Sequence, residues 1–388
     1  MLRPVVAPDP PPPPRGLLVE LYSNGSENMH HLRDQGWVHL KGAVPPEKVA
    51  ELVRGYDDHL EKGGFRGRFG KPSTIDGVGS LPEHMWGIDV AYLPFSPAAW
   101  RARNAVRTVF ANEAGVDPES QAGSIDGTMA ARPDIKTDPP FDPTRPRLPT
   151  KANPKTGQPS GPGHVDQCPK NSATADSQQC FLALSRARLH DLSTVLLVPR
   201  GKWTIQGMMD AARAQFPKAF QESSRQGDGD GMFFPPHVQE WLVQQGVSKA
   251  IKPDLDPGDI LIWSSALPHC AGAGKLPRGG KRNPRLGQSV GFFPADRVSA
   301  AAKAIRWDLV AMGRCSGQQV HRPQPHLEWP PTIRRTKGGE ANWPPVYKGM
   351  KRMREEVKAG VRPPAHVDAP DDSEDARANK RLIRSLLG

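Results

Sequence analysis

Short apolar runs dominate the middle and second half of the chain, separated by stretches rich in turn residues. Runs of this kind lie at 179–184, 194–198, 260–263 and 287–293. Each has the length of a strand, and glycines and prolines are frequent between them. None approaches the roughly 18 apolar residues that a membrane-spanning helix requires. The pattern therefore predicts a mainly β fold without a membrane span.

Helical periodicity is clearest before residue 115. Gly36 ends a short helix that begins near Met29, and residues 37–41 alternate apolar and polar side chains like a half-buried strand. Pro45-Pro46-Glu47 then opens a helix that runs to about His59 and has one apolar face. Further helices are expected at 98–114, 205–221 (where Pro217 can introduce a kink), 237–245 and 376–387, and a further strand at 125–131.

Changes in composition divide the chain into segments. A run of prolines near the N-terminus predicts a disordered leader over residues 1–27. Residues 133–163 hold nine prolines without periodicity, which is typical of an insertion in a domain expected at 28–296. Residues 297–388 carry 18 Lys/Arg against 10 Asp/Glu and repeat the tripeptide Trp-Pro-Pro. We interpret this last segment as a basic C-terminal extension.

The cysteines and the N-terminal sequence indicate in which cellular compartment the protein is expected. Cys168, Cys180, Cys270 and Cys315 show no Cys-x-x-Cys spacing, which argues against a zinc ribbon or a disulfide scaffold. The N-terminus lacks the apolar core of a signal peptide. We therefore expect a soluble intracellular protein with reduced thiols, and the sequence does not distinguish the cytoplasm from the nucleus.

Two segments carry residues that suit a metal ion. In His164-Val165-Asp166, positions i and i+2 of an extended strand place an imidazole and a carboxylate on one face. Pro257-Gly258-Asp259 makes a tight turn before an apolar strand, and His269 lies at the far end of that segment. Two histidines and one carboxylate on one face of an octahedron are the ligand set of non-heme Fe(II) oxygenases. The pattern therefore predicts that His164, Asp166 and His269 bind a metal.

An anionic co-substrate needs a fixed positive charge. Arg285 begins the apolar strand that follows His269, so its guanidinium can point inward and hold a carboxylate with two parallel hydrogen bonds. Arg278 and Arg282 are rivals in the preceding loop, which is rich in glycine and proline. We favour Arg285 because only this arginine is followed directly by the strand.

Together these motifs resemble the phytanoyl-CoA dioxygenase family of Fe(II)/2-oxoglutarate-dependent oxygenases. The resemblance covers about residues 28–295 and includes an N-terminal helix followed by Gly-Trp-Val-x-Leu-Lys-Gly. It implies a double-stranded β-helix, that is, a cupin-like jelly roll, mainly β with flanking helices. It also implies Fe(II) bound by His164, Asp166 and His269, with 2-oxoglutarate held by Arg285 and O2 as the second co-substrate.

The resemblance suggests further residues near 2-oxoglutarate. Gln179 and Phe181 share one face of the next strand and either line the co-substrate pocket or belong to the core. Arg132 ends a strand at a place where the family often has a basic residue. Related halogenases replace the carboxylate with a small residue, so Asp166 favours hydroxylation or another oxidation over halogenation.

The substrate is not encoded in these motifs. Residues 271–285 hold five basic side chains and no acidic one, and together with the basic extension they suggest an anionic substrate, with a nucleic acid as one alternative. A small-molecule substrate beside a merely solvated basic loop is the other interpretation. A catalytically silent jelly-roll binding module is the alternative from a different class.

Overall fold

The computed structural model describes residues 25–76, 88–89, 93–131, 140–143, 163–166, 177–223, 232–311 and 374–387, with single positions at 133, 148, 315 and 320. Most of the leader predicted at 1–27 and of the insertion predicted at 133–163 lies outside the described residues.

Eight strands form two antiparallel sheets that face each other. From β4 to β12 the chain passes to the other sheet at each step except from β7 to β9, which pair within one sheet. This winding produces the order β10-β6-β12-β4 in one sheet and β5-β11-β7-β9 in the other. Such a winding is a double-stranded β-helix, so the predicted jelly roll is confirmed. The strands are β4 (Thr128–Ala131), β5 (His164–Val165), β6 (Gln178–Ala183), β7 (Ser193–Pro199), β9 (Ser248–Ile251), β10 (Ile260–Ser264), β11 (His269–Gly272) and β12 (Arg285–Pro294).

Short strands extend both sheets. The major sheet contains β1-β10-β6-β12-β4-β2, with β3 paired to β12, and the minor sheet contains β8-β5-β11-β7-β9. The strand predicted at 37–41 is therefore confirmed as an edge strand of the major sheet. The added strands are β1 (Trp37–Leu40), β2 (Ile88–Asp89), β3 (Gln121–Gly123) and β8 (Met232–Phe233).

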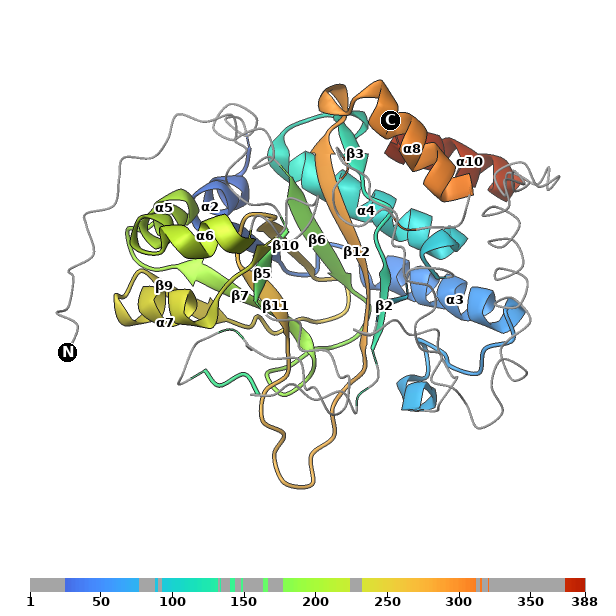
Figure 1. The fold of residues 1–388 in the computed structure, drawn as a ribbon. Helices are drawn as coiled ribbons and strands as arrows, with labels where there is room; N and C mark the ends of the chain where they lie inside the picture. The colour runs from blue at the N-terminus through green and yellow to red at the C-terminus, as the bar shows by residue number, and fades with distance from the viewer. Residues whose placement is uncertain are drawn as a thin grey trace.

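Helices cover the outer faces of the two sheets (Figure 1). In α3, Leu52, Tyr56 and Leu60 recur at helical spacing, and they pack with α4 against outward-facing residues of the major sheet. Beside the minor sheet, α5 and α7 contribute apolar side chains to a second core that extends between the sheets. The helices are α2 (Glu27–Gln35), α3 (Pro46–Lys62), α4 (Pro97–Ala114), α5 (Ile205–Gln215), α6 (Pro217–Ser223), α7 (Pro236–Gln244), α8 (Ala300–Ala311) and α10 (Glu374–Leu387). Short 3-10 helices lie at Pro72–Asp76, Leu93–Phe95, Pro118–Ser120 and Ala295–Arg297.

Two elements differ from the sequence prediction. The helix expected at 205–221 is two helices, because Pro217 starts a new one after Phe216 leaves the helical conformation. The strand expected from residue 125 begins only at Thr128. The residues before it form a loop in which Ser124 exchanges hydrogen bonds with Gly291 and the Asp126 carboxylate accepts from the Gly127 N–H.

The C-terminal helices pack on the jelly roll, beside α4 (Figure 1). Leu386 of α10 is buried against Trp100, Ile125 and residues of α8. The guanidinium of Arg306, on α8, is buried and donates to the backbone oxygens of Gly123 and Leu386. Helix α8 was not predicted from the sequence. The domain boundary at residue 296 stays a prediction, with α8 and α10 both attached to the predicted domain.

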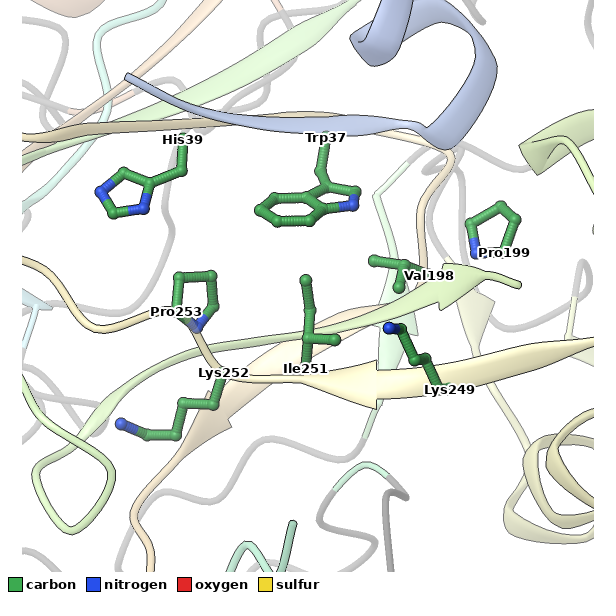
Figure 2. Close-up of a pocket in the computed structure, with 8 residues that line it drawn as sticks. All are labelled: Trp37, His39, Val198, Pro199, Lys249, Ile251, Lys252 and Pro253. Atoms are coloured by element: carbon green, nitrogen blue, oxygen red, sulfur yellow. The ribbon is translucent and has the colours of Figure 1, made fainter. Parts of the chain in front are cut away.

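A groove of about 370 Å³ lies between β1 and β9, the edge strands of the two sheets. Figure 2 shows Trp37 and Ile251 facing each other across it. Its lining consists of Trp37, His39, Val198, Pro199, Lys249, Ile251, Lys252 and Pro253. None of the predicted metal ligands is among these residues, so the groove is separate from the predicted site.

In the described part of the chain, no helix combines the length and the apolar composition needed to cross a membrane.

The packing of α10 leads to the first prediction. Leu386→Ala removes a side chain that is 1% exposed, so we expect a loss of about 2–5 kcal/mol in the free energy of unfolding. Arg381→Ala, at an exposed position of the same helix, should change it by less than about 0.5 kcal/mol. Urea denaturation measures both. Equal stability of the two variants would mean that α10 does not contribute to the core.

Candidate metal centre

Strand β5 presents two of the predicted ligands. His164 pairs with His269 of β11 and with Phe233 of β8, and Asp166 follows the strand, its N–H donating to Ser265 O. Val165 between them is fully buried and belongs to the apolar core. The two polar side chains thus share one face while Val165 faces away, as the strand periodicity predicted.

Gly163 explains why the chain can enter this strand. A Cβ added here would lie 2.6 Å from Leu148 Cδ1 and 2.8 Å from Gln239 Nε2. Gln239 is itself held, because its amide donates to Phe234 O. A side chain at position 163 would therefore displace the start of β5, and His164 and Asp166 with it.

The third predicted ligand, His269, is positioned by a turn and by a contact of its ring nitrogen. His269 begins β11 directly after the segment Ser264–Pro268, in which Leu267 N donates to Ser264 O. Its Nδ1 lies 2.8 Å from Leu267 O. A carbonyl oxygen only accepts, so Nδ1 carries the proton and Nε2 keeps a lone pair for a metal.

The three side chains converge. His164 Nε2 lies 3.5 Å from Asp166 Oδ1, and His269 Nε2 lies 3.2 Å from Asp166 Oδ2. The centroids of the two imidazole rings are 4.5 Å apart. One ligand atom from each residue lies within 4.8 Å of the others. Antiparallel pairing of β5 with β11 therefore assembles a ligand set from positions about a hundred residues apart in sequence.

The electrostatics of the cluster suit a cation. Burial disfavours the charged form of Asp166, but the neighbouring His164, the contact with His269 and the hydrogen bond from Gln179 outweigh it and lower the pKa of this carboxyl well below its usual range. Asp166 is thus ionised at neutral pH. An anionic oxygen beside two imidazole nitrogens is a donor set that fits a divalent transition metal such as Fe(II).

Arg285 lies inside the barrel, as predicted. It is 5% exposed, its Nη2 donates to Thr194 Oγ1 over 2.8 Å, and its guanidinium carbon stands 4.7 Å above the ring of Phe181. Burial lowers its pKa to about 10, so it remains charged at neutral pH. Its Nε is buried and has no hydrogen-bond partner among the described residues. A buried cation with a donor to spare suits an anionic ligand.

A second basic side chain, that of Lys252, lies near Arg285. The Lys252 ammonium donates to Arg188 O over 2.7 Å, and burial, followed by the charge of Arg285, contributes to lowering its pKa to about 7. Asp191 acts in the opposite direction. Lys252 is therefore only partly protonated at neutral pH, beside an Arg285 that keeps its charge.

The rivals of Arg285 lie elsewhere. Arg278 is exposed on the loop between β11 and β12, which projects away from both sheets (Figure 1). Arg282 lies in the loop predicted for it, where a solvent-exposed side chain would be expected. It is instead partly buried and donates to the backbone oxygens of His190 and Gly274, so it is held at the base of the loop.

The remaining candidates divide into three groups. Gln179 donates from its amide to Asp166 Oδ2, and Phe181 is a core residue beneath the Arg285 guanidinium. Cys270 is buried in the wall next to His269. Arg132 and Cys168 lie outside the described residues.

Thr194 was missed by sequence reasoning. It lies on β7, opposite Ala271 in the register with β11, and nothing in its local sequence separates it from an ordinary strand threonine. Thr194 lies two residues before Leu196, the residue that pairs with His269. Strand residues two positions apart face the same side, and only this spacing could have indicated that Thr194 faces the barrel interior.

Asp126 was missed as well. Its side chain is 7% exposed, its backbone oxygen accepts from the buried Arg103, and its carboxylate accepts from Gly127 N over 2.7 Å. Burial raises its pKa to about 6, and the charge of Asp166 adds to the shift. A second buried carboxyl thus lies within electrostatic range of the triad.

Comparisons with known proteins give structural likeness only. The sequence matches no protein-family model and no curated protein. Among solved structures, the chain is similar to the epimerase SnoN, crystallised with Fe3+, alpha ketoglutarate and nogalamycin RO, at 15% identity and a TM-score of 0.38, over 72% of this chain and 84% of that one.

Two further structures show comparable likeness. The carbocyclase SnoK from nogalamycin biosynthesis, described as non-heme and alpha ketoglutarate dependent, is 14% identical with a TM-score of 0.40, over 71% of this chain and 86% of that one. HygX from Streptomyces hygroscopicus, with nickel and 2-oxoglutarate bound, is 14% identical with a TM-score of 0.34, over 69% and 86%.

The raised pKa of Asp126 predicts a pH-dependent stability. Between its ordinary pKa of 3.8 and about 6, the folded protein holds a proton that the unfolded chain has lost. The stability of wild type relative to Asp126→Asn should therefore be greatest below about pH 4 and fall by on the order of 2–3 kcal/mol as pH rises through 6. Asparagine cannot ionise, yet its oxygen can still accept from Gly127.

Urea unfolding of both proteins between pH 4 and 7 measures this difference. A stability difference that does not change with pH would contradict a raised pKa at Asp126.

Proposed function

We propose that this protein is a non-heme Fe(II)- and 2-oxoglutarate-dependent dioxygenase of the phytanoyl-CoA dioxygenase type. The observation that carries the proposal is the convergence of His164, Asp166 and His269, with ligand atoms within 4.8 Å of one another, in a jelly roll. Two histidines and one carboxylate occupy one face of an octahedral metal and leave the opposite face open. A structural site would instead enclose the metal completely.

Arg285 provides the anchor for the co-substrate. Its guanidinium donates to the Thr194 hydroxyl, and a carboxylate placed beside this pair would meet a fixed charge and a neutral donor. The ring of Phe181 packs under the guanidinium and restricts its orientation. When bound, the iron with 2-oxoglutarate and O2 supplies an oxidising species, as 2-oxoglutarate is decarboxylated to succinate and CO2.

Contacts within the chain hold the proposed metal ligands in place. His269 is fixed by its Nδ1–H bond to Leu267 O, and Asp166 remains ionised because its neighbours lower its pKa. The carboxylate of Asp166 fills the ligand position that halogenases leave for a halide, so hydroxylation or a related oxidation is the proposed reaction. The apolar walls around the triad, including Leu196 and Trp263, limit access of water.

The proposed substrate is a small or anionic molecule. Lys275, Arg278 and Lys281 are exposed on the loop between β11 and β12, so the charge predicted there is available to a ligand. A nucleic acid would require counterion release, and a steep fall of affinity with salt would identify it. Salt-independent substrate affinity would indicate a small neutral molecule.

The triad is tested by single substitutions. His164→Ala, Asp166→Ala and His269→Ala should each reduce Fe(II)-dependent succinate formation from 2-oxoglutarate by at least about 100-fold, since each removes one of three ligands. Circular dichroism and the melting temperature check that the fold remains. A variant that keeps full activity would exclude its residue from the metal centre, and absence of any iron-dependent turnover in wild type would refute the proposed function.

Arg285 is tested by binding of 2-oxoglutarate. Arg285→Ala should weaken binding by on the order of 30- to 1000-fold, that is, about 2–4 kcal/mol, because a buried carboxylate loses its charged partner. Arg285→Lys should recover only part, since one ammonium cannot replace the two-pronged contact. Arg278→Ala, on the exposed loop, serves as the control and should change affinity less than about threefold. Calorimetry with an inert divalent metal provides the measurement.

A further inference from the structure

Gln179 lies in the major sheet, beside the three proposed metal ligands. It belongs to β6, pairs with Trp263 of β10 on one side and with Gly291 of β12 on the other, and is 2% exposed. Strand alternation and its contact with Asp166 place its side chain on the face of the major sheet that looks at the minor sheet. It is thus a buried neutral amide directly behind a proposed metal ligand.

The hydrogen bonding of this amide is one-sided. Its Nε2 donates to Asp166 Oδ2, while its Oε1 is buried without a partner among the described residues. An ionised carboxylate only accepts, so the NH2 group of Gln179 must face Asp166. Burying an amide is unfavourable unless it is hydrogen-bonded, and here the single bond goes to the carboxylate.

This bond distinguishes the two oxygens of Asp166. Oδ2 accepts from Gln179 and lies 3.2 Å from His269 Nε2, whereas Oδ1 faces His164 at 3.5 Å. A carboxylate with both oxygens unrestrained can turn and bind a cation through both. A carboxylate with one oxygen held by a rigid strand neighbour has a fixed orientation.

We propose that Gln179 is a positioning residue that holds Asp166 Oδ2 and leaves Oδ1 as the single oxygen ligand. This inference rests on the proposed function, since it assumes the metal centre. One-oxygen ligation would leave three positions of an octahedral metal open. A chelating 2-oxo acid would occupy two of them, and the last would remain for one further small ligand. In this role Gln179 acts on the metal through Asp166.

The test uses Co(II), whose visible absorption spectrum reports coordination number. Gln179→Met keeps the length of the side chain and removes the donor. We expect a 10- to 100-fold loss of Co(II) affinity by calorimetry, in the range found for groups that orient metal ligands, and a changed Co(II) spectrum. The melting temperature of the metal-free protein separates this effect from a loss of folding.

Gln178→Met is the matched control. Gln178 neighbours Gln179 on the same strand, is 1% exposed, and by strand alternation points to the opposite face. Its variant should keep the Co(II) affinity and spectrum of wild type. If Gln179→Met does not fold, Gln179→Asn keeps an amide, shortens it by one methylene, and should show the same loss.

The outcomes are distinct. If the Gln179 variant binds Co(II) with the affinity and spectrum of wild type, Gln179 does not position Asp166, and the metal centre stands without it. Equal losses in the Gln178 and Gln179 variants would also overturn the inference, because the effect would then belong to strand β6 in general. If wild type itself binds neither Co(II) nor Fe(II), the proposed function fails and this inference with it.

Discussion

The antiparallel pairing of β11 with β5 is the interaction on which the rest of the site depends. It places His269 opposite His164, and Asp166 follows His164 at the end of the strand. Pairing of β11 with β7 on its other side puts Leu196 and Thr194 on the inner face, where Thr194 accepts a hydrogen bond from Arg285. A shift of one residue would turn every one of these side chains to the opposite face. The close packing at Gly163 helps to prevent that shift.

Buried charge imposes the second constraint. Arg285 and Asp126 are almost fully removed from solvent and Asp166 is partly buried, and burial disfavours the charged form of each. Asp166 is stabilised as an anion by its neighbours, Arg285 keeps its charge over an aromatic ring, and Asp126 titrates near neutral pH. The three groups therefore differ in charge at neutral pH although all are shielded from solvent. The interior holds a positive charge at Arg285 and a negative charge at Asp166.

Local sequence was sufficient for features that depend on neighbouring residues in the chain, such as which side chains of a strand share a face. The spacing in His164-Val165-Asp166 and the strand that follows Arg285 fixed which side chains point inward, because strand periodicity is a local property. Helix α8, the packing of α10 against Ile125 and the braced position of Arg282 were not predicted. Their partners lie far away in sequence, so no local pattern specifies them.

By itself, the sequence indicated the proposed ligands and favoured Arg285 over Arg278, since side-chain chemistry and short-range geometry decide these. The jelly-roll class followed from the resemblance of the motifs to a known family. The tertiary structure decided which oxygens and nitrogens meet: Thr194 with Arg285, Gln179 with Asp166, and Asp126 near the triad. The physical reason is that hydrogen bonds and pKa values depend on burial and on contacts between strands that pair across the two sheets, which only the folded chain creates.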